Sequence, residues 1–339
     1  PEDEPQFDPG VLTEGDKTYL YTGFCGRGDK SRHGAMGMVL DTDMLTITEG
    51  PVFVAPGCEY SEGTGFEGHE YFEAASIRKK GDLYLFIYSS IVMHELCYAW
   101  SRSPLSGFQY GGVLNSNADI GIDTYKPADL PAAYGANNHG SVVNIGEDWY
   151  IFYHRHTNGT WFSRQGCAEK LPIREDGFFG QAELTSCGLN GGPLKGEGYY
   201  PSYIACHLFT DQPVLYVGNS AEPAYSNGSF PKIVKEGWDG DRNEGYLTNL
   251  RDSATAGFRY FNLEGVSGIT LTIRGYAYGS MELRTAFDGP VVKVIPLHYS
   301  NIWADISSDL TLPEGADTLY FTYRGAGMAS FKGFTLRKG

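Results

Sequence analysis

Three ionisable residues, Asp8, Glu73 and His139, follow one another at nearly equal spacings along the chain, because 73 − 8 is 65 and 139 − 73 is 66. Hydrolysis of a glycosidic bond needs a protonated acid and a second carboxylate, which lie roughly 6.5 to 9.5 Å apart in inverting enzymes. Asp8 and Glu73 supply two such groups, and His139 adds an imidazole. If the fold gathers them, they predict acid–base chemistry.

The segments that these three residues begin repeat one pattern, in which a Gly-containing turn separates a short segment from an aromatic strand. The copies are Asp8–Leu12, Glu73–Ile77 and His139–Val143, followed by the strands Thr18–Tyr21, Leu83–Tyr88 and Trp149–Tyr153. A fixed period of this size, built from short strands and turns, is typical of a radially repeated β-sheet protein. Because equivalent positions of successive blades point at one axis, we expect the three residues to meet in a central cavity.

The composition favours an all-β fold. Aromatic residues make up 14% of the 339 residues, and the chain has 24 Tyr and 45 Gly. Aromatic residues fill pleated surfaces, and Gly supplies the positive φ angles of tight turns. This length suits two domains, each with its own core.

The repeated region extends to about Phe209, and a segment rich in Gly, Pro, Asn and Ser follows at 219–231. Beyond it, short strands such as Thr270–Arg274 and Met281–Thr285 alternate apolar and polar residues, which is typical of a β-sandwich. We therefore predict a partial β-propeller catalytic domain over 1–215 and a β-sandwich over 228–339.

Three repeats do not close a propeller, since blade counts run from about four to eight. Asp8 lies only seven residues from Pro1, so the first repeat lacks the preceding segment that the other two have. We expect about two further blades, on the order of 130 residues at this period, from upstream sequence or a companion chain.

The net charge limits the kinds of ligand that the protein can bind, and the cysteines indicate its redox compartment. A formal net charge of −15 argues against nucleic acid, and no stretch approaches the roughly 20 apolar residues of a membrane span, so neutral ligands remain. The six Cys residues lack CxxC spacing, which favours buried thiols in a reducing compartment over a disulfide framework or a zinc site. We expect a cytoplasmic protein, with secretion left open because the true N-terminus is not seen.

Glu73 is the candidate acid, because the aromatic residues Phe66, Tyr71 and Phe72 precede it. Apolar surroundings disfavour the charged form of a carboxyl group, so an enclosed Glu keeps its proton near neutral pH. His139 could ligate a metal, orient water or hydrogen-bond a sugar hydroxyl.

Structural roles for these residues are the alternative. An Asp before Pro is usually a turn former, and a Glu that begins a strand is usually solvated. Three different ionisable types at one repeated position favour function, since a structural role would keep one residue type.

Four further side chains are candidates for contact with a substrate. His69 and His94 are each either a satisfied, partly buried histidine or a substrate contact. Arg164 could donate a fork of hydrogen bonds to sugar hydroxyls, or form a surface ion pair. Phe66 belongs to a loop that would close a pocket and so favour exo action.

In these segments the chain resembles glycoside hydrolase family 43, five-bladed propeller enzymes that act on arabinose- and xylose-containing polysaccharides. Phe7–Val11 resembles the third-blade segment, Phe72–Lys79 the fourth-blade segment and Asn138–Ser141 the fifth-blade segment. Ser163–Gln165 is similar to a stretch that contacts sugar in some members. The C-terminal segment resembles the carbohydrate-binding type β-sandwich often attached to such enzymes.

The resemblance implies a role for each matched residue. Glu73 would be the general acid, and Asp8 would modulate its pKa and orient it. His139 would face the central channel and help to hold a Ca²⁺ ion through water, and no organic cofactor is expected. The general base of the family, an Asp of the first blade, has no counterpart after Pro1 and would be supplied upstream.

The leading hypothesis is an inverting exo-glycosidase that releases arabinofuranosyl or xylosyl residues from oligosaccharides derived from plant polysaccharides. A β-galactofuranosidase is an alternative, since one methylol group separates the substrates. The other alternative is a sugar-binding protein without turnover.

Overall fold

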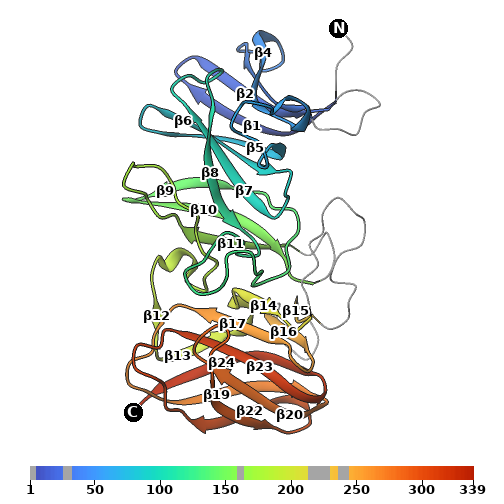
Figure 1. Ribbon diagram of the computed structural model, residues 1–339, viewed down its shortest axis with the longest axis vertical. Helices are drawn as coiled ribbons and strands as arrows, with labels where there is room; N and C mark the ends of the chain where they lie inside the picture. The colour runs from blue at the N-terminus through green and yellow to red at the C-terminus, as the bar shows by residue number, and fades with distance from the viewer. Residues whose placement is uncertain (1–4, 26–32, 159–163, 213–229, 236–243) are drawn as a thin grey trace. The chain divides into compact units, whose positions relative to one another are not determined.

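The computed structural model describes residues 5–25, 33–158, 164–212, 230–235 and 244–339 (Figure 1). Within these residues the chain is built from β-strands, with three short 3-10 helices, Cys58–Tyr60, Gly188–Asn190 and Ser202–Ile204, as its only helices. None of the described helices is long and apolar enough to cross a membrane. The expected all-β fold is confirmed.

The chain divides into two compact units. The first consists of 1–117, 136–155 and 166–183, and the second of 118–135, 156–165 and 184–339. The predicted linker lies largely outside the described residues, as does the predicted boundary between 215 and 228.

Two four-stranded antiparallel sheets, each with its strands in sequence order, come first in the N-terminal unit. Their strands are β1 (Gln6–Glu14), β2 (Lys17–Phe24), β3 (Gly34–Leu40) and β4 (Ile47–Pro56), then β5 (Tyr71–Lys80), β6 (Leu83–Ser90), β7 (Glu95–Ser101) and β8 (Gln109–Ser116). A three-stranded sheet follows, made of β9 (Ser141–Ile145), β10 (Asp148–His156) and β11 (Arg164–Lys170). The repeat thus predicts the sheets correctly, since each copy begins the first strand of one sheet.

Aromatic side chains fill the core between the first two sheets. Tyr21, Phe86 and Tyr88 are fully buried, and the ring centroids of Tyr21 and Phe86 lie 5.9 Å apart. These residues belong to the aromatic strands of the repeat, whose buried faces pack against the neighbouring sheet. Each buried ring removes a large apolar area from water, which stabilises the packing of one sheet on the next.

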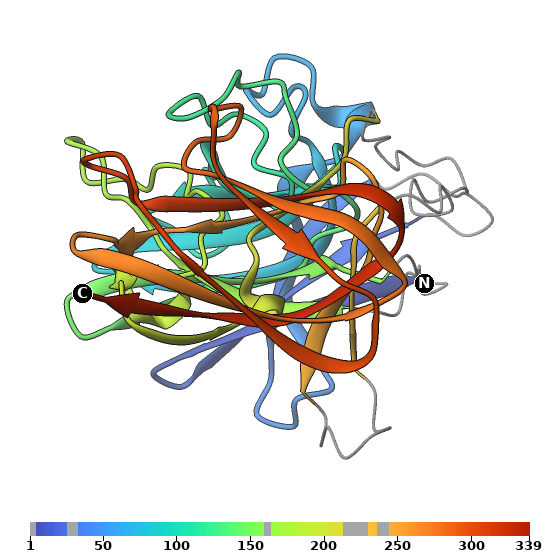
Figure 2. The ribbon, with the colours of Figure 1, turned by 90° about the horizontal axis from the view of Figure 1, so that it is seen from below.

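Two stacked sheets form the sandwich of the C-terminal unit (Figures 1 and 2). One sheet has the order β15-β16-β24-β19-β22 with β13 also on β24, and the other has the order β14-β17-β23-β20-β21. Their strands are β13 (Gly198–Pro201), β14 (His207–Phe209), β15 (Lys232–Lys235), β16 (Gly245–Leu250), β17 (Thr255–Arg259), β19 (Val266–Gly275), β20 (Ala277–Arg284), β21 (Val291–Leu297), β22 (Ser300–Asp309), β23 (Thr318–Gly327) and β24 (Ala329–Lys338). Two further short strands, β12 (Leu194–Lys195) and β18 (Phe261–Asn262), pair with each other in parallel. Along the chain, β12 precedes β13 and β18 lies between β17 and β19.

The sandwich core is aromatic as well. Phe258, Phe321, Phe331 and Phe334 are fully buried, and the rings of Phe258 and Phe334 meet edge to face at 5.0 Å. Phe331 and Phe334 are three residues apart on β24, and the register shift of this strand between Phe331 and Gly333 lets both rings face the same core.

All six cysteines lie within the described residues, and no disulfide bond joins any two of them there. Cys97 and Cys206 are buried, Cys58 is exposed, and the other three are half-buried. The predicted burial of the thiols thus does not extend to Cys58.

Candidate active site

Asp8 and Glu73, the first residues of the first two copies of the repeat, lie in β-bulges near the start of their strands, whereas His139 precedes β9. The pairing of β1 with β2 shifts between Phe7 and Gly10, and the pairing of β5 with β6 shifts on both sides of Glu73. Asp8 and Ala74 adopt left-handed backbone angles, with φ of 49° and 69°. A bulge with such a residue re-aims the neighbouring side chains, and this strained geometry is concentrated at functional sites.

A hydrogen bond joins the two bulges. The backbone N–H of Ala74 donates to Oδ2 of Asp8 at 3.1 Å. The carboxylate of Asp8 therefore lies against the residue that follows Glu73, although 66 residues separate the bonded pair. Both carboxyl side chains are half-buried.

The third copy of the repeat lies beside the second. The hydroxyl oxygens of Ser76 on β5 and Ser141 on β9 are 2.8 Å apart, within hydrogen-bond distance. His139 lies two residues before Ser141 and is exposed. The start of β5 thus bonds to β1 on one side and to β9 on the other, as expected for neighbouring blades, whereas the functional roles of Asp8, Glu73 and His139 stay predictions.

The other predicted site residues have varied settings. Phe66 is 2% exposed and packs on Tyr88 and Tyr110 in the core, with centroids 6.3 and 6.0 Å away. Arg164 is exposed on β11. Sugar contact by either residue stays a prediction.

His94 is buried at the β6–β7 turn. Its Nδ1 lies 2.9 Å from the hydroxyl of Ser116, and its carbonyl oxygen accepts hydrogen bonds from Asn117 N–H at 2.9 Å and Asn138 Nδ2 at 3.4 Å. Burial lowers the pKa of His94, so its imidazole is neutral near pH 7. Contact between His94 and a sugar stays a prediction.

Two asparagines next to this turn have amide oxygens without a partner among the described residues. Asn117 and Asn138 are fully buried, and their Oδ1 atoms accept no hydrogen bond. A buried carbonyl oxygen without a partner is costly unless water or a cation contacts it. Asn138 directly precedes His139, so this oxygen belongs to the fifth-blade segment.

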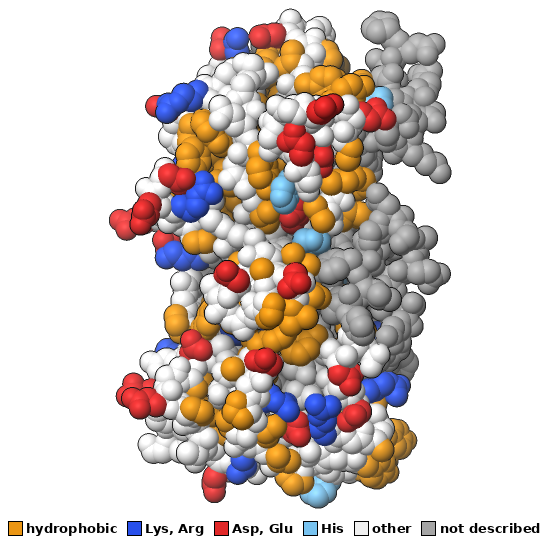
Figure 3. Space-filling model, in the orientation of Figure 1, with side chains coloured by type: hydrophobic (Ala, Val, Ile, Leu, Met, Phe, Trp, Pro, Cys, Tyr) orange, Lys and Arg blue, Asp and Glu red, His pale blue; other side chains and the backbone are white. Residues whose placement is uncertain are grey.

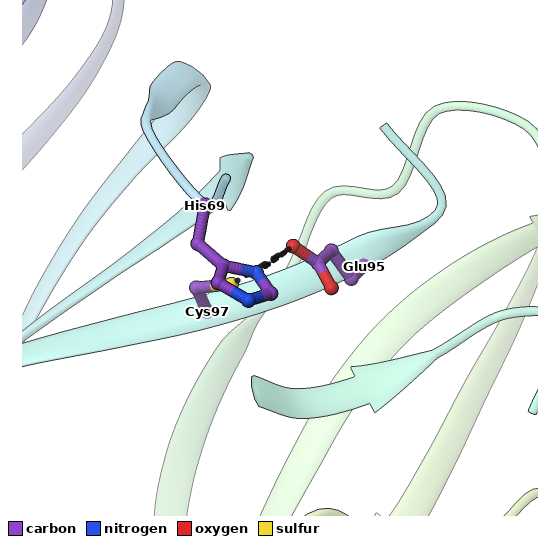
Figure 4. Close-up of side chains that lie close together, drawn as sticks. All are labelled: His69, Glu95 and Cys97. Carbon is purple, nitrogen blue, oxygen red and sulfur yellow. Dashed lines mark hydrogen bonds and ion pairs between the residues drawn. The ribbon is translucent and has the colours of Figure 1, made fainter. Parts of the chain in front are cut away.

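His69 belongs to a cluster that its sequence position does not indicate. Its Nδ1 lies 2.6 Å from Oε1 of Glu95, and the Cys97 thiol lies 3.4 Å from the same oxygen (Figure 4). The hydrogen bond to Glu95 raises the pKa of His69. Burial acts to raise the pKa of Glu95, but its hydrogen bonds with His69 and Ser90 outweigh burial and hold that pKa below its usual value.

The sequence alone presents His69 as a single residue and assigns no role to Glu95 or Cys97. The available signal was spacing, because residues two apart on a strand share a face, as Glu95 and Cys97 do on β7. Asn138 gave no such signal, since its unpartnered oxygen depends on the packing of distant loops.

Successive antiparallel sheets with their strands in sequence order are the arrangement of a β-propeller, and Asp8 of the first sheet bonds to the residue that follows Glu73 in the second. The chain is 58% identical over 334 residues to a xylosidase/arabinosidase from Thermoclostridium stercorarium, which covers 98% of this chain and 70% of that protein. It is 22% identical over 346 residues to an arabinoxylan arabinofuranohydrolase from Paenibacillus polymyxa, which covers 95% of this chain and 49% of that protein. The chain belongs to glycoside hydrolase family 43.

Solved structures are also similar to the chain. A glycoside hydrolase family 43 arabinoxylan arabinofuranohydrolase from Bacillus subtilis aligns with a TM-score of 0.47 and 19% identity, which covers 98% of this chain and 67% of that one. No family model matches the sequence.

Proposed function

We propose that this chain carries the general acid, Glu73, and its modulating carboxylate, Asp8, of an inverting exo-glycosidase. The proposed substrates are oligosaccharides derived from plant polysaccharides, from which arabinofuranosyl or xylosyl residues are released. The names of the relatives from Thermoclostridium stercorarium and Paenibacillus polymyxa support this substrate class.

The hydrogen bond from Ala74 N–H to Asp8 Oδ2 is the observation that carries the proposal. It ties the carboxylate of one sheet to the bulge that holds Glu73 in the next sheet. A general acid in glycoside hydrolysis must carry a proton that it gives to the leaving oxygen. Glu73 would donate that proton to the leaving oxygen, while Asp8 orients the bulge through the Ala74 amide.

An inverting reaction also needs a base that activates water on the opposite face of the sugar. We propose that this base is an Asp supplied from upstream of residue 1. Three sheets do not close a propeller, so the further sheets would come from upstream sequence or a companion chain.

The test uses the full-length protein with a panel of 4-nitrophenyl glycosides. Glu73→Gln should lower the turnover of the preferred substrate by about 10² to 10⁴, and Asp8→Asn should lower it as well. Asp82→Asn is the matched control, because Asp82 is an exposed carboxylate in the turn at the other end of β5 and β6. Equal rates for Glu73→Gln and the parent would remove Glu73 from this role.

The same panel separates the alternatives. Preference for arabinofuranoside or xyloside supports the proposal, whereas preference for galactofuranoside identifies a β-galactofuranosidase. Calorimetric binding of xylose or arabinose oligomers with no release of reducing ends identifies a sugar-binding protein.

A Ca²⁺ ion next to His139 is part of the proposal. Ca²⁺ takes oxygen ligands, and the buried, unpartnered Oδ1 of Asn138 is an oxygen of the required kind beside His139. The ion would supply positive charge near the carboxyl pair. Addition of Ca²⁺ to chelator-treated protein should raise the melting temperature of the parent protein but not of Asn138→Ala, and an equal response of both proteins would exclude Asn138 as a ligand.

Sugar binding by the sandwich is a second proposed function. Tyr276, Tyr278 and Tyr299 are 66%, 61% and 46% exposed. The ring centroid of Tyr299 lies 5.1 Å from that of Tyr276 and 6.3 Å from that of Tyr278, and the planes of Tyr278 and Tyr299 differ by 7°. A contiguous exposed aromatic surface marks a binding site, and flat rings suit the C–H faces of sugars.

Calorimetry with xylo-oligosaccharides tests this surface. Tyr276→Ala and Tyr299→Ala should each weaken binding to the sandwich by about tenfold or more, which corresponds to loss of one stacking contact. Tyr199→Ala, at a half-exposed tyrosine on β13, is the control. If Tyr276→Ala and Tyr299→Ala both bind the xylo-oligosaccharides as tightly as the parent does, these tyrosines do not take part in sugar binding.

A further inference from the structure

We propose that His69, Glu95 and Cys97 form a binding site for a divalent transition metal ion, with Zn²⁺ as the preferred ion. The site is separate from the carboxyl pair and from the proposed Ca²⁺ position, because it uses none of their residues. Its ligands would be Nδ1 of His69, a carboxylate oxygen of Glu95 and the thiolate sulfur of Cys97.

The three ligand atoms already converge. They all lie within 4.8 Å of one another, with 2.6 Å from Nδ1 to Oε1 and 3.4 Å from Sγ to Oε1 (Figure 4). Zinc bonds of about 2.0 to 2.3 Å in a tetrahedron place ligand atoms roughly 3.3 to 3.8 Å apart. The nitrogen and oxygen therefore need to separate by less than about 1 Å for an ion to replace the proton between them.

Surrounding side chains hold the ligands in place. The hydroxyl of Ser90 donates to Oε1 of Glu95 at 2.5 Å, and Tyr88 donates to the carbonyl oxygen of His69 at 2.8 Å. The ring of Tyr110 stacks on the imidazole with centroids 5.0 Å apart and an angle of 12° between planes. Contacts of this kind orient metal ligands and tune their affinity.

The charge and burial of the cluster favour a cation. Glu95 and Cys97 are buried, and three donors, Nδ1 of His69, the hydroxyl of Ser90 and the Cys97 thiol, point at one carboxylate oxygen. A buried carboxylate is costly unless positive charge compensates it. A metal ion would supply that charge, with the thiol and Nδ1 protons released on binding.

His69 leaves a route for the ion and room for a fourth ligand. Its side chain is 36% exposed, whereas that of Glu95 is 6% exposed. Three protein ligands with water in the fourth position are usual for zinc sites that remain open to solvent. Nitrogen, sulfur and carboxylate together select Zn²⁺ over the hard ions Mg²⁺ and Ca²⁺.

The site lies at the same end of the sheet as Glu73. Tyr71 pairs with Ser90 and Glu73 with Ser89, and Ser89 pairs with Leu96, the neighbour of both Glu95 and Cys97. A bound ion would tie the segment before β5 to the start of β7, next to the bulge of Glu73. We therefore expect Zn²⁺ to raise the melting temperature of the protein.

Metal binding by the full-length protein tests the proposal. Chelator-treated protein is titrated with Zn²⁺ in a calorimeter, and Co²⁺ is added separately to observe a thiolate-to-cobalt charge-transfer band. The parent should bind one Zn²⁺ per chain at this site, and Cys97→Ser should bind it about 10 to 100 times more weakly or not at all. Cys206→Ser is the matched control, since Cys206 is also buried but belongs to the sandwich.

His69→Gln is a second variant, and it changes a side chain that is 36% exposed instead of one buried in the core. Loss of Zn²⁺ affinity and of the cobalt band in Cys97→Ser and His69→Gln, with both kept in Cys206→Ser, supports the site. Equal Zn²⁺ affinity in parent and His69→Gln, or no cobalt band in the parent, overturns it. If Cys97→Ser does not fold, His69→Gln alone decides.

Discussion

Asp8 and Ala74 show how single residues prepare this site. Both have a positive φ angle although neither is glycine. Asp8 lies in the bulge of β1 and Ala74 in the bulge of β5, and these are the first strands of the first two sheets. The Asp8 carboxylate compensates the bulge of β5 by accepting the Ala74 N–H. This hydrogen bond joins the two bulges and stabilises their unusual backbone conformation.

Gly10 lets the two strands approach. A Cβ at this position would lie 2.8 Å from the carbonyl oxygen of Ala75 and 3.1 Å from Cα of Ser76, both backbone atoms. Gly10→Ala should therefore destabilise the protein by about 1 to 3 kcal/mol, measured by urea unfolding, because β1 and β5 must separate. Gly166→Ala is the control, since a Cβ there meets nothing within 4 Å. Equal stability of both variants would mean that the close approach is not required.

At the scale of elements, the links between sheets lie at both ends of the strands. Near the repeat positions Ser76 of β5 faces Ser141 of β9. At the far end of β1, Glu14 forms an ion pair with Lys79 of β5 and accepts a hydrogen bond from Tyr84 of β6. The sequence period predicts that these sheets are neighbours, but it does not say which side chains join them.

The Glu14 link predicts a pH dependence. Hydrogen bonds from Lys79 and Tyr84 hold the pKa of Glu14 below its usual 4.5. A carboxyl group with a lowered folded-state pKa stabilises the protein above its unfolded pKa and loses that effect as the pH falls through the folded value. Glu14→Gln should therefore melt below the parent at pH 7, and the difference should shrink as the pH falls below about 4.5.

The effect should be modest, because this pair lies at the surface. Glu147→Gln, at an exposed position in the β9–β10 turn, should melt like the parent at every pH. A Glu14→Gln deficit that stays constant down to acid pH would show that the carboxylate charge is not responsible.

Local patterns predict strands better than they predict the surroundings of a side chain. The aromatic strands of the repeat are where we expect them, because alternation and β-propensity are local properties. Phe66 and Tyr71 are both buried and pack on Tyr88, and their enclosure of Glu73 stays a prediction. The contact between His69 and Glu95 joins residues 26 apart, so it depends on how a loop packs on a strand.

At the scale of the whole molecule, strand pairing decides which residues belong to the sandwich. β13 and β14 precede the predicted linker, but β13 pairs with β24 and β14 pairs with β17. Their sequences are short and lack the alternation that marks the later strands. Their place in the sandwich is visible only from their pairing with strands far along the chain, and the local sequence pattern does not predict that pairing.

The net charge of −15 predicts how the enzyme responds to salt. Acidic side chains are spread over the face in Figure 3, with basic ones between them. A neutral oligosaccharide is neither attracted nor repelled by the net charge of the protein. The kcat/KM for such substrates should therefore change little between about 0.01 and 0.15 M ionic strength. Xylo-oligosaccharides that carry a uronic acid should be repelled at low salt and gain kcat/KM as salt rises, and a fall with salt would contradict this account.

The dependence of rate on the leaving group tests the role of Glu73 most directly. An acid catalyst matters most for a leaving oxygen that needs a proton and least for one that departs as a stable anion. We predict that Glu73→Gln lowers turnover of methyl and xylobiose-type glycosides by about 10² to 10⁴, with a much smaller loss on 2,4-dinitrophenyl glycosides. An equal loss on both kinds of substrate would show that Glu73 does not donate the proton, and the account of the paired bulges as an acid site would be wrong.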